Sequence, residues 1–130
     1  MPNKDTYHES SVATSLAPAV YAATTKGGPV DVRDFHSALL VVNTGAIAGA
    51  GDYTLSVQEA DTNVDADFTN VAAADLLGTL PVTLEASTSY RVGYIGKRKF
   101  ARAVITKNSG TSIAANASFV LQGPAIAPLA

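Results

Sequence analysis

Apolar and polar residues alternate along several stretches of the chain, with the period of a strand that buries one face. In residues 53–59, YTLSVQE, every second residue from Tyr53 to Val57 is apolar. Residues 90–106, YRVGYIGKRKFARAVIT, contain two such runs on either side of Gly96 and a basic segment. We therefore predict that residues 90–106 form two strands folded about a basic turn.

Other apolar stretches predict further strands. Residues 38–42 are continuously apolar, which is typical of a strand buried on both faces, and residues 38–59 are predicted to form a hairpin around a glycine-rich loop. Shorter strands are predicted at residues 30–32 and 117–122, an extended segment at residues 82–84 and one helical turn at residues 71–77. The predicted fold class is all-β, a single-domain antiparallel β-sandwich or open barrel, and base rates favour the sandwich.

The first 29 residues lack this alternation and mix Ser, Thr and Ala with prolines and a Gly-Gly pair. We predict an extended N-terminal arm at residues 1–29, a β-sandwich domain at residues 30–124 and a C-terminal tail at residues 125–130. Residues 10–20 of the arm are compatible with a strand or with a short helical turn before Pro18. The arm either wraps a neighbouring subunit or is a terminus with no specific contact.

The amino-acid composition limits the size of the core and the kinds of site that the chain can form. Twenty-three residues are Ala, while there are four Phe, five Tyr, one Met and no Trp, so the predicted core is thin. The absence of cysteine excludes disulfides, zinc–thiolate sites and a thiol nucleophile, and suits a reducing cytoplasm. The N-terminus has no signal-peptide layout and no run approaches the length of a membrane span, so we expect a soluble protein with no membrane partner.

Charge is unevenly distributed along the chain. Residues 52–85 contain seven acidic residues and no Lys or Arg, whereas residues 91–107 contain six basic residues and no acid. These segments complement each other within one subunit, between neighbouring copies, or against another surface. The sequence leaves all three arrangements open.

Chemistry-bearing motifs are sparse. The acidic loop at residues 61–67 places oxygen ligands at alternate positions, but a calcium loop needs Gly at its sixth position and Glu at its twelfth, where this chain has Ala66 and Ala72. A solvated acidic loop without metal is the favoured interpretation. The histidines, His8 and His36, fit no recognisable triad, and no nucleophile elbow or phosphate-binding glycine loop occurs. We therefore expect no enzymatic activity, no cofactor and no metal.

Basic residues interleaved with aromatic ones are also typical of nucleic-acid binding. The chain as a whole is acidic, with a pI near 5.5, and Phe100 is expected in the core, so a protein surface is favoured over nucleic acid. The predicted interface residues are Lys97, Arg98, Lys99 and Arg102 of the basic segment, with Tyr7 and His8 of the arm.

Four segments resemble a family of small proteins encoded beside the major capsid protein in the head-gene module of tailed phages and prophages. They are LAPAVYAAT (16–24), VDVRDFHSALLVVNTGAI (30–47), VAAADLLGT (71–79) and YRVGYIGKRKFARAVIT (90–106). The resemblance implies a virion structural protein, in particular a capsid decoration or cement protein. Such a protein binds the major capsid protein outside the shell, often as a trimer. It implies assembly in the host bacterial cytoplasm and a final location on the capsid exterior.

Two other roles remain open at this point. One is a head–tail connector or tail component, which would form a higher-order ring. The other is a receptor- or glycan-binding module displayed on the particle, which would need exposed aromatics such as Tyr53, Tyr90 or Tyr94. Their alternation instead predicts that these tyrosines are buried.

Overall fold

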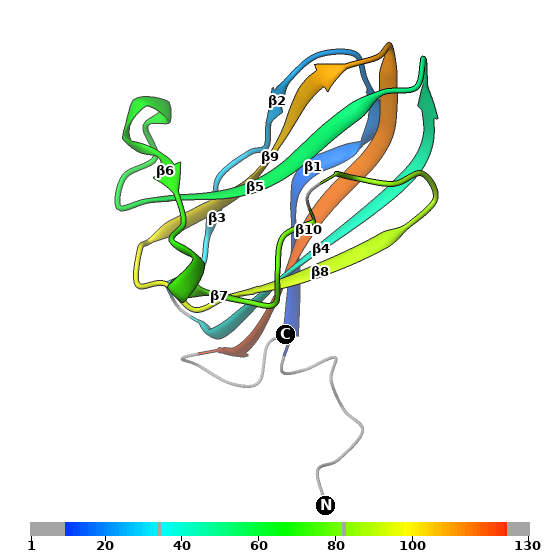
Figure 1. Ribbon diagram of the computed structural model, residues 1–130. Coiled ribbons are helices and arrows are strands. Elements are labelled where there is room, and N and C mark those ends of the chain that lie inside the picture. The colour runs from blue at the N-terminus through cyan, green and yellow to red at the C-terminus, as the bar shows by residue number, and fades with distance from the viewer. Residues whose placement is uncertain (1–9, 34, 82, 125–130) are drawn as a thin grey trace, which may run out of the picture.

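Alternating apolar positions place one face of each strand between two antiparallel sheets (Figure 1). The computed structural model describes residues 10–33, 35–81 and 83–124. The first sheet has the order β1 (Ser10–Tyr21), β10 (Ser112–Pro124), β4 (Phe35–Ala48), β8 (Ser89–Tyr94) and β7 (Leu76–Leu77). The second has the order β2 (Thr25–Lys26), β9 (Phe100–Ser109), β5 (Asp52–Ala60) and β6 (Thr69–Asn70), and β3 (Val30–Asp31) also pairs with β9. The predicted all-β sandwich is confirmed.

The core lies between the inward faces of the long strands. Phe119 of β10 lies opposite Leu40 of β4, and Leu55 of β5 lies opposite Ile105 of β9, all of them fully buried. Alanines fill inward positions where larger residues would force the sheets apart, at Ala101, Ala103 and Ala117. The core is therefore thin, as the composition predicts.

The strand pairing differs from the prediction at both proposed hairpins. β4 pairs with β10 and β8 in the first sheet, whereas β5 pairs with β9 in the second, so residues 38–59 cross between sheets. Likewise β8 and β9, the two strands of residues 90–106, lie in different sheets. A period of two fixes which face of a strand is buried but does not identify its partner. The basic turn therefore connects a strand of the first sheet to a strand of the second.

The sandwich also begins earlier than predicted. Residues 10–21, assigned to the arm, form β1, which pairs with β10 along its length and buries Leu16. The alternation of β1 is obscured because its register shifts twice, between Thr14 and Leu16 and between Leu16 and Ala19. Pro18 is tolerated because β1 is an edge strand of the sheet.

Two smaller predictions are adjusted. β4 is not buried on both faces, because Leu39 and Val41 on its outer side remain partly exposed. The predicted turn at residues 71–77 is a 3₁₀ turn, η2 (Ala73–Asp75), followed by β7, and Gly78 ends it with φ +89°. The predicted tail, residues 125–130, and the predicted interface residues Tyr7 and His8 lie outside the described residues.

Candidate functional site

The acidic loop folds onto the outer face of the second sheet through Arg102. Arg102 is only 4% exposed, and its guanidinium donates from Nη1 to Asp65 Oδ1 at 2.6 Å and from Nε to Gln58 Oε1 at 2.9 Å. It also stacks 4.1 Å from the centroid of the Phe68 ring. Arg102 therefore anchors a loop of its own subunit and is not available as the interface residue that the sequence predicts.

The contact with Arg102 makes the stability contributed by this loop depend on pH. Hydrogen bonds from Arg102 first, and then from Lys26, lower the pKa of Asp65 below its usual 3.8. A lowered folded-state pKa means that the stabilisation is present above pH 3.8 and is lost as the pH falls through the folded-state value. Asp65→Asn should therefore lower the urea midpoint at pH 7, and the gap to wild type should close below pH 3.8. Asp75→Asn, at a carboxylate with no cation partner among the described residues, is the control. A gap that stays constant down to pH 2.5 would contradict the assignment.

The basic turn, residues 95–99, is tied to the second sheet at its base. Tyr94, at the end of β8, donates its hydroxyl proton to Glu59 Oε1 of β5 at 2.7 Å and accepts from the Arg98 amide at 3.2 Å. Burial first, and then the bond to Glu59, raise the pKa of Tyr94, so the phenol stays protonated as a donor. At the tip, Arg98 Nη1 donates to Asp61 Oδ2 at 2.5 Å, which raises the pKa of Arg98. The turn and the acidic loop therefore lie side by side.

Two buried tyrosines should respond oppositely to loss of their hydroxyl groups. Tyr94→Phe removes two hydrogen bonds and leaves the Arg98 amide without this partner, so we expect a loss of about 1–2 kcal/mol of stability. The Tyr53 hydroxyl is buried with no hydrogen-bond partner in the described structure, so Tyr53→Phe should be neutral or slightly stabilising. Urea unfolding of both variants checks this, and equal losses would contradict it.

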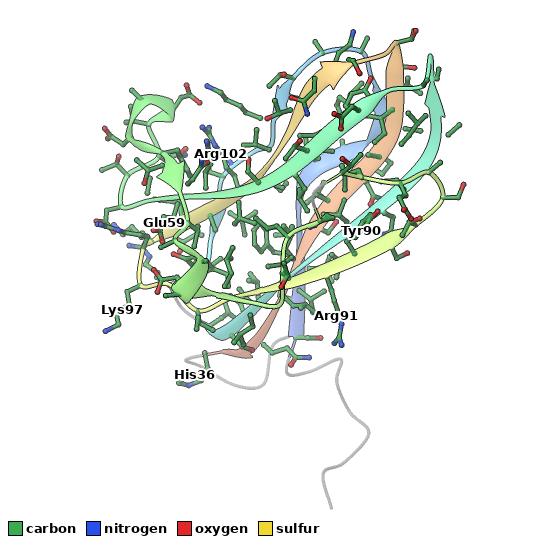
Figure 2. All side chains as sticks on the ribbon, in the orientation of Figure 1. His36, Glu59, Tyr90, Arg91, Lys97 and Arg102 are labelled. Atoms are coloured by element: carbon green, nitrogen blue, oxygen red, sulfur yellow. The ribbon has the colours of Figure 1, made fainter. Side chains whose placement is uncertain are left out.

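A cleft of about 270 Å³ lies between the basic turn and the start of β4. Basic groups from Arg33, His36, Lys97 and Arg98 line it, together with the apolar side chains of Phe35 and Ile95. None of the lining residues that the structure describes is acidic. Figure 2 shows Lys97, Glu59 and Arg102 along one side of the molecule, with His36 near Lys97.

The carboxylates of the acidic loop are engaged separately. Asp61 pairs with Arg98, Asp65 pairs with Arg102 and Lys26, and Asp67 accepts from Thr62 Oγ1 at 2.5 Å. Within the described ranges, no three His, Asp or Glu side chains gather in a way that could hold a metal ion. The same ranges contain no helix long and apolar enough to cross a membrane.

The outer face of the first sheet carries a cross-strand row of apolar positions. In antiparallel pairs, directly opposed residues share a face. The register places Val12 of β1 opposite Val120 of β10, which lies opposite Leu39 of β4. Leu39 lies opposite Gly93 of β8, which lies opposite Leu77 of β7, so the row crosses all five strands. Its ends are strongly exposed, Val12 at 68% and Leu77 at 58%.

The rows beside it are polar but almost uncharged. One of these rows consists of Thr14, Ser118, Val41 and Arg91. The other consists of Asn116, Asn43 and Ser89. Arg91 is the one charged residue that the register places on this face, and Figure 2 shows it apart from Lys97. A hollow of about 290 Å³ lies around Gly93, lined by Leu39, Leu77 and Arg91. Depletion of charge is the compositional mark of an interface core.

The interface residues predicted from the sequence fall near one of these two candidate surfaces. Of the predicted interface residues, Lys97 and Arg98 lie at the cleft, Lys99 is in the same turn, and Arg102 is buried against the acidic loop. The face of the first sheet was missed, although a signal exists. Residues 10–25, 35–51 and 108–130 contain no Asp, Glu, Lys or Arg, and they supply β1, β4 and β10, three neighbouring strands.

No protein-family model and no curated protein matches the chain. Among solved structures, the SPBc2 prophage-derived protein YomS is similar with a TM-score of 0.50 and 12% identity, over 87% of this chain and 92% of that one. A chain of infectious bursal disease virus, Gx strain, has a TM-score of 0.44 at 12% identity, over 92% of this chain and 34% of that one. PirA has a TM-score of 0.43 at 12% identity, over 92% and 97%. At 12% identity, the match to YomS shows a shared fold alone.

Proposed function

We propose that this protein is a non-enzymatic virion structural protein that decorates the outside of a capsid shell. The observation that carries the proposal is the outer face of the first sheet, which has an apolar row across five strands and, among the described residues, a single charged residue, Arg91. The resemblance of the sequence to head-module proteins of tailed phages, and the fold it shares with a prophage-derived protein, support the same role. The partner is the major capsid protein, bound through this face.

Docking of this kind stabilises a shell by mass action, because a ligand that binds only the assembled lattice shifts the equilibrium towards assembly. The test compares capsids of the parent phage or prophage with and without this gene product. We expect the decorated capsids to withstand higher temperature and lower salt, and the protein to sediment with them. Equal tolerance of the two capsids, with the protein left in the supernatant, would overturn the proposal.

A glycan- or receptor-binding module is less well supported. Such a module needs an exposed aromatic platform. Tyr53 and Tyr94 are buried, and Tyr90 is half-buried with its hydroxyl accepting from the Glu85 amide at 2.8 Å. Within the described ranges, every aromatic side chain is buried or partly buried.

A further inference from the structure

We propose that copies of this protein bind one another by inserting the acidic loop of one subunit, residues 61–67, into the basic cleft of the next. This contact goes beyond shell docking, because it uses the side of the sandwich and leaves the outer face of the first sheet free. The occupant of the cleft is thus a second copy of the same chain.

The loop carries an apolar tip within a ring of carboxylates. Val64 is 52% exposed, although an apolar side chain of this size is usually buried. Asp61, Asp65 and Asp67 flank it, and all three remain exposed despite their contacts within the subunit. Neither Val64 nor Asp67 lines the cleft of its own subunit, so the tip is free to enter another.

The cleft has the opposite character. Ile95, 50% exposed, and Phe35 offer apolar surface to Val64, while Lys97 lies on the cleft wall with no ion pair to any described residue. An exposed cation without a partner, beside an exposed apolar side chain, suits a segment that presents a carboxylate next to a valine. The Asp67 carboxylate, whose one described partner is the Thr62 hydroxyl, is the carboxylate assigned to Lys97.

The loop and the cleft lie on the same side of each subunit. The Arg98–Asp61 ion pair joins the loop to the cleft wall, so the two surfaces lie next to each other on one side of the subunit. A contact between two different surfaces of identical subunits generates a ring when the rotation closes.

The test measures self-association of the purified protein, without any shell, by sedimentation velocity over a concentration series. We expect oligomers that weaken as salt is raised. Lys97→Glu and Asp67→Lys should each weaken association about tenfold or more, because each places like charges together. The double variant should recover association to within about threefold of wild type. Arg91→Glu, on the docking face, is the matched control and should associate normally.

Lys97 and Asp67 are exposed, so both reversals should fold, and the thermal midpoint of each variant verifies this. Lys97→Gln and Asp67→Asn, which remove charge without reversing it, give a second and milder series. A wild-type protein that stays monomeric, or reversals that leave association unchanged, would overturn the inference. If the protein is monomeric but still coats capsids, the contact between copies is refuted and the proposed function stands. If it forms oligomers that do not coat capsids, the proposed function is refuted and the contact between copies stands.

Discussion

Gly27→Ala is expected to destabilise the protein by about 3 kcal/mol and to lower its melting temperature by about 10 °C. Gly27 lies where the edge of the sandwich is closed between β1 and β9. Its amide donates to Ala103 O at 2.7 Å, and the Gly28 amide donates to Ser15 O at 2.6 Å. Ser15 Oγ accepts from the Ala103 amide and donates to Gly28 O, each at 3.0 Å. An alanine Cβ at position 27 would lie 2.3 Å from Ser15 Oγ and 2.7 Å from Ala103 O.

The neighbouring glycine supplies the control. A Cβ at Gly28 meets nothing closer than Ser15 O at 3.7 Å, and neither glycine has a positive φ. Both substitutions reduce the entropy of the unfolded chain equally, so the difference between them reports the clash. Gly28→Ala should be within about 0.5 kcal/mol of wild type or slightly more stable. Thermal unfolding followed by circular dichroism measures both variants, and equal midpoints would contradict the edge closure.

Leu39→Lys is expected to weaken shell binding by at least about thirtyfold while leaving the fold intact. Leu39 lies in the middle of the apolar row, between Val120 and Gly93, so a lysine there buries an unpaired charge when the face docks. In the free subunit the lysine stem can lie along the sheet with its ammonium group in water. Stability should therefore change little.

Ser56→Lys is the matched control for this substitution. Ser56 is in the central part of β5 and lies opposite Val104, on the outer face of the second sheet. A lysine there also adds one charge to a sheet surface, but on the side that carries the acidic loop. Binding to capsids, measured by co-sedimentation, should match wild type for Ser56→Lys. Equal loss for both variants would show that added charge, and not the position, is responsible.

The fold class can be predicted from the sequence, because apolar and polar residues alternate at residues 53–59 and 90–106. This alternation is the pattern of strands that bury one face. Strand pairing does not follow, since β4 and β5, or β8 and β9, would show the same alternation in one sheet or in two. For residues 10–20 the sequence left a strand or a helical turn open, because the two register shifts of β1 interrupt the period that identifies a strand.

The candidate surfaces differ in how well they can be predicted from the sequence. The basic turn is a local run of charges, so its position at a surface is readable from residues 97–99. The burial of Arg102 depends on Asp65 and Phe68, more than 30 residues away, and only the folded loop brings them together. The apolar row takes one residue from each of five strands, and it becomes a surface only through the register.

Cryo-electron microscopy of the intact particle that carries this protein tests the docking of the first sheet on the shell. We expect sandwiches on the outside of the shell with the first sheet against the capsid lattice, so that Val12, Leu39 and Leu77 are covered. A sandwich found at the neck or tail, or a first sheet that faces solvent while another surface contacts the shell, would contradict the proposed docking.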